Sequence, residues 1–306
     1  MINGYFTGGD NFGRQSFAAH HDLIDKVIPA WLELKSDGSL KEKSTITDKD
    51  LLEKHMGKGD IIPLLQNYGL QSNVSNSIIN NHRLWPVVYC NISEYLRNRG
   101  YKRINLNLEG VNRELKDSFS RFVNILAGYL RRYKLELELS LPAKAMNFNN
   151  SSWSGAYDYE VLSQSVARIV IMAYDYHWSG GPPGPVAPLS WVQDVIDYAI
   201  MKIPLEKIVL GIPCYGYKWD IEHYEGKARG LSYQQVIKTA ALNKVKIEWD
   251  QESFSPYVKY NNHEIWFENR DSIIKKINLV REFQLNGAAF WRLGLEDTRI
   301  WNRILN

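Results

Sequence analysis

The sequence predicts an α/β fold, a (β/α)8 TIM barrel with a small α+β insertion between its seventh strand and seventh helix. Two observations favour this fold. Short apolar, strand-like runs alternate with helix-like segments along the whole chain of 306 residues, and eight such runs suit a closed parallel barrel. An open doubly wound sheet usually carries a G-x-G-x-x-G loop after its first strand, and Gly8-Gly9-Asp10 does not have that form.

The first predicted elements are bounded by turn-forming residues. The apolar run Ile2–Thr7 is the first strand, and a loop rich in Gly, Asp and Asn extends from it through Gly13. The run Val27–Leu34 is the second strand, and a turn at Asp37-Gly38 separates it from the next helix. That helix is predicted over Asp48–His55, and a third strand is predicted over Asp60–Gln66.

The fourth predicted strand, Arg103–Glu109, comes after a helix that ends near Arg99 and alternates with a period of two. Its apolar set is Ile104, Leu106 and Leu108, and its polar set is Asn105, Asn107 and Glu109. Burying unpaired polar groups would cost roughly 2–7 kcal/mol each. The polar row is therefore either the wet face of an edge strand or an inward row in a barrel. In a barrel, Glu109 would stand at the carboxyl-end rim, where barrel enzymes keep their catalytic groups.

Helical spacing over Asn112–Tyr133 places apolar side chains on one stripe. The stripe consists of Phe119, Phe122, Val123, Leu126 and Leu130. Apolar runs and helical patterns continue to the end of the chain. The later predicted elements are a strand over Leu135–Leu141 stopped by Pro142, a short helix over Tyr159–Val166, a strand over Arg168–Tyr174, a helix over Trp191–Met201, strands over Ile208–Pro213 and Gly287–Trp291, and a last helix over Asp297–Leu305.

The alternation of strand and helix is interrupted between the seventh and eighth strands. This interval contains a predicted helix, Ser232–Leu242, and strand-like pieces at Val245–Trp249, Pro256–Tyr260 and Glu264–Phe267. We interpret residues 217–268 as a small α+β insertion that is too short to be an independent domain. The chain 1–306 is then expected to be a single barrel domain.

Composition excludes several classes of protein. The chain is 44% hydrophobic and 23% charged, an ordinary globular balance. A net charge of +3 without basic runs does not favour nucleic acid as a partner. No apolar run approaches the roughly 20 residues of a membrane span, and strand-like residues from Ile2 leave no signal peptide. Apart from His177, which belongs to a strand-end motif, the histidines have no metal-ligand spacing. We expect neither a metal nor a cofactor. The two cysteines, Cys90 and Cys214, form no disulfide framework, although they could pair with each other.

Polar and aromatic residues gather where four predicted strands end. These are Asn105, Asn107 and Glu109 in the fourth strand; Met172-Ala-Tyr174-Asp175-Tyr176-His177-Trp178 at the sixth; Pro213-Cys214-Tyr215-Gly-Tyr217 at the seventh; and Phe290-Trp291-Arg292 at the eighth. Aromatic faces cover the apolar face of a sugar ring, and polar groups hold its hydroxyls. This combination favours a carbohydrate-binding site, which would also account for the ten tryptophans and eighteen tyrosines.

These motifs make the resemblance specific: the chain resembles glycoside hydrolase family 18, and within it the spore-cortex-lytic and spore-germination N-acetylglucosaminidase branch. The family ends its fourth strand with Asp-x-x-Asp-x-Asp-x-Glu. Lys102, Asn105, Asn107 and Glu109 fall on those positions. Met172-Ala-Tyr174-Asp175 matches the family's Met-x-Tyr-Asp, and Trp291 matches its tryptophan at the end of strand eight. The resemblance covers the catalytic domain, without the LysM repeats that often precede it in that branch.

The resemblance implies a substrate-assisted retaining hydrolase of β-1,4 bonds after N-acetylglucosamine, with chitin oligosaccharide or peptidoglycan, plausibly of the spore cortex, as substrate. Glu109 would be the acid/base, Asn107 would orient the acetamido group, and Tyr174 would assist catalysis. The implied substrate-binding residues are Asn105, Met172, Asp175, Tyr176, His177, Tyr215, Trp291 and Tyr5. We expect a monomer that binds neither nucleic acid nor membrane. It would act at the spore or cell wall after removal of any export segment, or in the cytoplasm if Met1 is native.

Asn107 departs from the family, which has Asp there. An amide cannot balance a full positive charge, and the loss of one charge-assisted contact costs roughly 2.7–4 kcal/mol, or about 10²–10³ in rate. The alternative function is therefore a chitinase-like carbohydrate-binding protein that has lost the reaction. A barrel acting on a phosphorylated metabolite is disfavoured, because no Gly-rich phosphate site comes after strands seven and eight.

Overall fold

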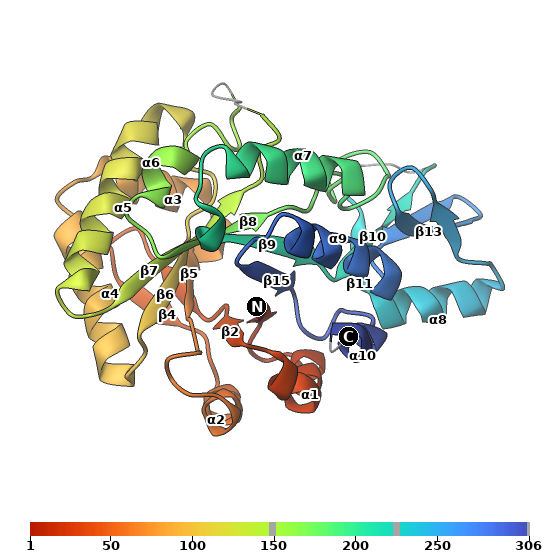
Figure 1. Ribbon diagram of the computed structural model, residues 1–306, viewed down its shortest axis with the longest axis horizontal. Coiled ribbons are helices and arrows are strands. Elements are labelled where there is room, and N and C mark those ends of the chain that lie inside the picture. The colour runs from red at the N-terminus through yellow and green to blue at the C-terminus, as the bar shows by residue number, and fades with distance from the viewer. Residues whose placement is uncertain (147–150, 223–226, 305–306) are drawn as a thin grey trace.

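In the computed structural model, which describes residues 1–146, 151–222 and 227–304, the chain forms a parallel barrel surrounded by helices (Figure 1). The barrel strands are β1 (Ile2–Phe6), β2 (Lys26–Pro29), β3 (Leu32–Leu34), β5 (Leu64–Asn67), β6 (Arg103–Asn107), β7 (Glu136–Pro142), β8 (Arg168–Met172), β9 (Ile208–Pro213) and β15 (Gly287–Trp291). Their order in the sheet is β2-β1-β15-β9-β8-β7-β6-β5-β3, and a further strand, β4 (Leu40–Glu42), adds an antiparallel hairpin to β3. The predicted TIM barrel is confirmed.

The ring closes through the second predicted strand, which is broken in two. β2 pairs with β1, and β3 pairs with β5. Val27 bridges Ile61 in parallel, and its carbonyl accepts from the Ile62 N–H at 2.9 Å. The prediction of one continuous strand over Val27–Leu34 was wrong, because the Trp31 N–H turns back to the Pro29 carbonyl at 3.0 Å and leaves the ladder.

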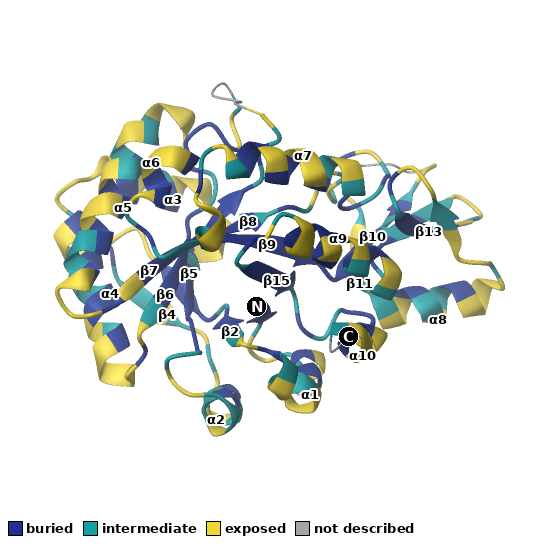
Figure 2. Ribbon diagram, viewed as in Figure 1, coloured by how far each residue is buried: buried dark blue, intermediate teal, exposed yellow. Residues whose placement is uncertain are grey.

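Helices surround the barrel and expose their outer faces, whereas the strands are buried (Figure 2). The helices are α1 (Asn11–His20), α2 (Ile46–His55), α3 (Ser72–Asn80), α4 (Trp85–Arg99), α5 (Lys116–Arg131), α6 (Tyr159–Ser163), α7 (Leu189–Ile200), α8 (Tyr233–Asn243), α9 (Arg270–Glu282) and α10 (Trp301–Ile304). The predicted apolar stripe of α5, from Phe119 to Leu130, is buried. The last residue of the predicted final helix, Leu305, lies outside the described residues.

Three helices, α1, α3 and α9, were not predicted. α1 begins inside the predicted loop because the Asp10 side chain caps it by accepting from the Phe12 N–H. α3 is rich in Ser and Asn, which form helices weakly, and it is held in place by the burial of Val74, Ile78 and Ile79. In α3, tertiary packing overrides the local preference of the sequence.

A second sheet comes after β9 and lies beside the barrel (Figure 1). Its strands, in the order β11-β10-β14-β13-β12, are β10 (Tyr215–Asp220), β11 (Arg229–Ser232), β12 (Glu248–Asp250), β13 (Ser255–Tyr260) and β14 (His263–Phe267). With α8 it has a small core of its own, formed by Leu231, Val236, Ala240, Val258, Ile265 and Phe267. The sheet begins at β10, a strand that was not predicted, because the barrel strand continues into it after one residue, Cys214.

The barrel interior and the helix layer have separate cores. Tyr5, Ile28, Ile62, Leu64, Val170, Val209 and Ala289 pack together inside the barrel. Ile104, Leu106 and Leu108 instead pack in the large core that the surrounding helices complete. The alternation of β6 therefore turns Asn105 and Asn107 towards the barrel interior, so the inward-row interpretation holds and the edge-strand interpretation was wrong. Among the described residues, no helix has the length and apolar character needed to span a bilayer.

Candidate active site

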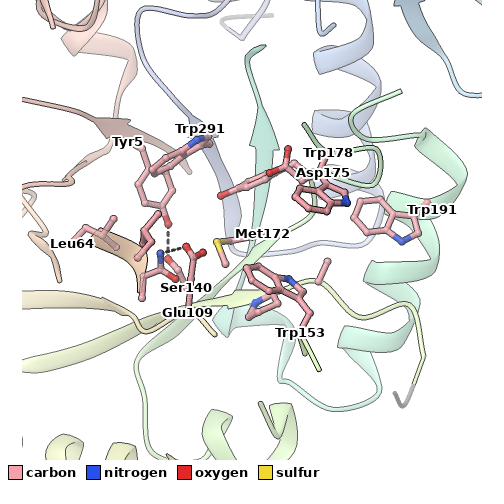
Figure 3. A pocket seen from close by; sticks show the side chains of 15 residues that line it. Tyr5, Leu64, Glu109, Ser140, Trp153, Met172, Asp175, Trp178, Trp191 and Trp291 are labelled. Atoms are coloured by element: carbon pink, nitrogen blue, oxygen red, sulfur yellow. Dashed lines mark hydrogen bonds between the residues drawn. The ribbon is translucent and has the colours of Figure 1, made fainter. Parts of the chain in front are cut away.

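A cavity of about 620 Å³ opens at the carboxyl ends of the barrel strands (Figure 3). It brings together seven of the predicted site residues: Tyr5, Asn107, Glu109, Met172, Tyr174, Asp175 and Trp291. The other lining residues are Leu64, Leu70, Ser140, Pro142, Ala143, Trp153, Trp178 and Trp191. Its volume lies within the usual range of small-molecule sites.

Glu109 lies just beyond β6 and points its carboxyl group into the cavity (Figure 3). Burial raises the pKa of this carboxyl group above its ordinary value, and the charge of Asp175 raises it further. The Asn107 amide Nδ2 donates to Glu109 Oε1 at 2.7 Å, which acts in the opposite direction but does not cancel the shift. A raised pKa suits a carboxyl group that acts as a general acid, because it favours the protonated form.

The other end of the Asn107 amide is unsatisfied. Its Oδ1 is buried and has no hydrogen-bond partner among the described residues. Buried polar atoms are nearly always paired, so an unpaired one needs an explanation. Asn107 lines the cavity, so this unpaired oxygen lies next to the space that a ligand would enter.

Beneath the cavity, a chain of hydrogen bonds links three barrel strands. The Tyr5 hydroxyl and Ser140 Oγ share a bond of 2.7 Å, and Ser140 donates to Asn105 Oδ1 at 2.7 Å. Asn105 is fully buried and does not line the cavity, so it is placed to support Ser140 and Tyr5. Ser140 was not predicted as a site residue. It lies between Leu139 and Leu141 in β7, so the alternation of polar and apolar residues that was noted in β6 could also have indicated Ser140.

The chain turns sharply after β8 at Asp175, which has a φ of 61°. Asp and Asn are enriched in this left-handed region, and residues held there often lie at functional sites. The Tyr215 and Tyr217 hydroxyls donate to Asp175 Oδ1 at 2.5 and 3.0 Å. These bonds lower the pKa of Asp175, but its burial within the concave site outweighs them and raises it.

Tyr174 lies against Gly211 on the neighbouring strand β9. A Cβ atom at Gly211 would stand 3.1 Å from Cε1 of the Tyr174 ring and 2.6 Å from the Ile171 carbonyl oxygen. The missing side chain therefore makes room for Tyr174 beside the cavity. Burial raises the pKa of Tyr174 well above its ordinary value, so the phenol stays neutral and can donate a hydrogen bond.

Aromatic rings line both sides of the cavity. Trp291 meets Tyr5 edge-on with ring centroids 5.0 Å apart, and Figure 3 shows the pair across the pocket from Trp178 and Trp191. Trp153 completes this second side. The three tryptophans of the second side were not predicted as site residues; the high tryptophan count and the position of Trp178 within the strand-six motif were the available signals.

Besides Asn105, three more predicted site residues do not line this cavity. Tyr176 is 52% exposed and packs against Trp191, and His177 bonds through Nδ1 to the Pro182 carbonyl at 3.0 Å. Tyr215 lines a neighbouring cavity of about 430 Å³ that shares Asp175 and Trp291 with the first. Tyr215 therefore contacts the first cavity indirectly, through its hydrogen bond to Asp175.

The family's outermost motif position, Lys102, lies far from the cavity. It is exposed and precedes β6, so the length of the strand separates it from Glu109, roughly 20 Å at about 3.3 Å per residue. Lys102 therefore has no direct influence on the Glu109 carboxyl. Within 1–146, 151–222 and 227–304, no group of three or more His, Cys, Asp or Glu side chains is placed to hold a metal ion. Both cysteines are free thiols.

The family model of glycosyl hydrolases family 18 matches residues 1–296. The chain belongs to glycosyl hydrolases family 18. It is 32% identical over 248 residues to the cortical fragment-lytic enzyme of Bacillus subtilis (strain 168), an alignment that covers 79% of this chain and 58% of that protein. It is also 28% identical over 286 residues to the cortical fragment-lytic enzyme of Bacillus anthracis, covering 89% of this chain and 65% of that protein. The resemblance stated from the motifs is confirmed.

Two solved structures agree with the fold. The crystal structure of the spore cortex-lytic enzyme SleL of Bacillus megaterium superimposes with a TM-score of 0.90 at 27% identity, covering 99% of this chain and 73% of that one. A chitinase from Chromobacterium violaceum gives a TM-score of 0.91 at 23% identity, covering 100% of this chain and 98% of that one, which shows the shared fold. The chain spans 58% and 65% of the length of the two cortical fragment-lytic enzymes.

Proposed function

We propose that this family 18 barrel is a retaining glycoside hydrolase that cleaves the β-1,4 bond after an N-acetylglucosamine residue. The observation that carries the proposal is Glu109, a carboxyl group with a raised pKa that faces a cavity walled by aromatic rings. Its relatives include proteins named as cortical fragment-lytic enzymes and chitinases. Peptidoglycan, in particular that of the spore cortex, or a chitin-like glycan is therefore the substrate class.

In the proposed mechanism, the acetamido oxygen of the bound N-acetylglucosamine attacks its own anomeric carbon. Glu109 donates its proton to the glycosidic oxygen as the bond to the leaving sugar breaks, and a cyclic oxazolinium forms. A water molecule then attacks the anomeric carbon and loses a proton to Glu109, which reopens the ring with retention of configuration. Because the substrate supplies the nucleophile, a second catalytic carboxylate is not required.

Asn107 would orient the acetamido group. Its buried, unpartnered Oδ1 could accept the acetamide N–H, which would leave the acetamide oxygen free to attack. Its Nδ2 already donates to Glu109 at 2.7 Å, so one side chain would hold both the acid and the nucleophile in register. Tyr174 and Asp175 would hold the sugar, and Trp291 would form the floor beneath it.

The proposal is tested with chemically defined N-acetylglucosamine oligomers and with cortex fragments. Glu109→Gln keeps the shape of the side chain and removes its proton, so we expect kcat to fall by about 10²–10⁴. Glu160→Gln, an exposed carboxylate on α6 paired with Lys202, is the matched control and should retain full activity. Equal turnover by the wild type and Glu109→Gln would show that Glu109 is not the general acid.

A second candidate function is a carbohydrate-binding protein without catalysis, and Asn107 in place of the family's Asp favours it. Asn107→Asp separates the two candidates, because it restores a charge that can balance the oxazolinium. A gain of orders of magnitude in hydrolysis over an inert parent, with unchanged oligosaccharide affinity, would identify the parent as a binder. If the parent already hydrolyses the oligomers and gains little from the substitution, it is the proposed enzyme, and the Asn107 amide is sufficient for catalysis.

The substrate class also implies where the protein works. A glycan of cortex or wall type lies outside the cytoplasm, so we propose that the protein acts at the spore or the cell wall, and as a monomer. Immunolabelling of sporulating cells or of spores, with wall fractions separated from cytosol, tests the location. A purely cytosolic distribution would contradict it.

A further inference from the structure

The backbone that carries Glu109 lies beyond β6, because that strand ends at Asn107. Residues 108–112 therefore leave the barrel ladder, and their polar backbone groups need other partners. Side chains from three other parts of the chain supply them. We call this loop, residues 108–112, the acid loop.

Two of these side chains bond to Glu109 itself. Its N–H donates to Asn67 Oδ1 at 3.0 Å, at the end of β5, and its carbonyl accepts from Ser75 Oγ on α3 at 2.8 Å. Both side chains belong to fully buried residues. Asn67 is itself held, because its Nδ2 donates to the Gln71 carbonyl at 2.9 Å.

The neighbouring part of the acid loop bonds to α3 as well. Asn76 donates through Nδ2 to the Gly110 carbonyl at 3.1 Å, and its Oδ1 accepts from the Asn112 N–H at 2.8 Å. Gly110 has a φ of 67°, and a Cβ atom there would stand 2.6 Å from Cβ of Ser72. The acid loop thus lies directly against the first turns of α3.

Tyr157 holds the acid loop from the opposite side. Its hydroxyl donates to the Leu108 carbonyl at 2.8 Å and accepts from the Val111 N–H at 3.4 Å, so it spans Glu109. The ring is fully buried and packs edge-on against Phe119, with centroids 5.2 Å apart. Its own carbonyl accepts from the buried Lys144 Nζ at 2.6 Å. Tyr157 is therefore a fixed group, anchored from both ends.

We propose that Tyr157 is a positioning residue for Glu109, which it serves by tying together the two backbone groups on either side of the acid without touching the substrate. This inference rests on the proposed function of Glu109. An acid misplaced by about 1 Å can cost about 10² in rate, and the bonds from Asn67 and Ser75 restrain the loop only from the β5 and α3 side. The phenol closes the loop across the remaining side.

The test compares Tyr157→Phe with Tyr89→Phe. Both rings are buried and both hydroxyls donate to a backbone carbonyl, Tyr89 to that of Phe122 at 3.1 Å in the helix layer, so both variants lose a similar bond. We expect kcat of Tyr157→Phe on N-acetylglucosamine oligomers to fall 10- to 100-fold with KM within threefold, and Tyr89→Phe to keep both constants. The alkaline limb of the kcat/KM profile of Tyr157→Phe should also move to lower pH, because a loosened loop admits water to Glu109.

A kcat of Tyr157→Phe within twofold of the wild type, with an unmoved alkaline limb, would overturn the inference. An equal loss in Tyr89→Phe would show that the effect is general destabilisation and would overturn it as well. If the wild type itself does not hydrolyse the oligomers, the proposed function is wrong, but the inference about Tyr157 can still be tested. Crystal structures of the two variants then test it. A displaced acid loop in Tyr157→Phe alone supports positioning, whereas an unchanged loop contradicts it.

Discussion

Glu109 destabilises the folded protein at neutral pH because burial favours the protonated form of its carboxyl group. Its pKa lies above the ordinary value of 4.5 that it regains in the unfolded chain. Below about pH 4.5 both states hold the proton, and the carboxyl group carries no penalty. As the pH rises from 4.5 through the folded-state pKa, only the unfolded chain releases the proton, and stability falls.

We expect Glu109→Gln to be more stable than the wild type at pH 7 and nearly equal to it at pH 4, since the amide has no proton to release. Urea unfolding at the two pH values measures the difference in free energy. Asp117→Asn on α5, which replaces an exposed carboxylate, serves as the control. A Glu109→Gln advantage that does not depend on pH would show that the titration of Glu109 is not its cause.

At the scale of elements, α3 is the support on which the acid loop rests. The contact is close because Gly110 has no side chain and adopts a φ of 67° beside Ser72, the first residue of the helix. Any side chain at Gly110 must move either the helix or the loop. A loop moved in this way carries Glu109 with it.

Gly110→Ala should therefore cost more than the backbone strain alone. Gly9 provides the control, because it has a φ of 78° and no atom within 4 Å of an added Cβ. We expect Gly9→Ala to lower the free energy of unfolding by about 1–2 kcal/mol, and Gly110→Ala by roughly 2–5 kcal/mol because the clash adds to the strain. Hydrolysis should fall only in Gly110→Ala. Equal losses of stability in the two variants would contradict the close contact.

At the scale of the whole molecule, a buried ion pair joins the second sheet to the barrel. Glu268 lies just after β14 and accepts from Lys276 Nζ on α9 at 2.8 and 3.0 Å, and also from Ser272 Oγ at 2.5 Å. Both charged residues are buried. The Glu268 N–H also donates to the Tyr215 carbonyl at 3.1 Å, so the pair lies where the chain leaves and re-enters the barrel.

Removing one member of this pair leaves a buried charge without its partner. We expect Lys276→Met to lower the free energy of unfolding by about 3–5 kcal/mol, and the double variant Lys276→Met with Glu268→Leu to recover most of that loss. Urea denaturation followed by tryptophan fluorescence measures both. A double variant as unstable as the single one would show that packing at these positions, and not the unpaired charge, sets the stability.

Much of this architecture could be predicted because it depends on local pattern. The strands β9 and β15 begin and end at the predicted residues, since each is a continuous apolar run between turn signals. Glu109, Asp175 and Trp291, which line the cavity, were expected there because each belongs to a motif at the end of a predicted strand. α3 could not be predicted, since its polar sequence becomes helical only through burial of its apolar side against the core.

The sequence by itself determined which residues of β6 share a face, because side-chain alternation is a property of the extended backbone. The tertiary structure decided which face of β6 lies inside the barrel, because the barrel has an interior only once the bridge between Val27 and Ile61 closes the ring of strands. The same closure brought Trp153, Trp178 and Trp191 to one cavity from separate loops and a helix. It also placed Tyr157 across Glu109, a contact between residues 46 or more positions apart that no local pattern encodes.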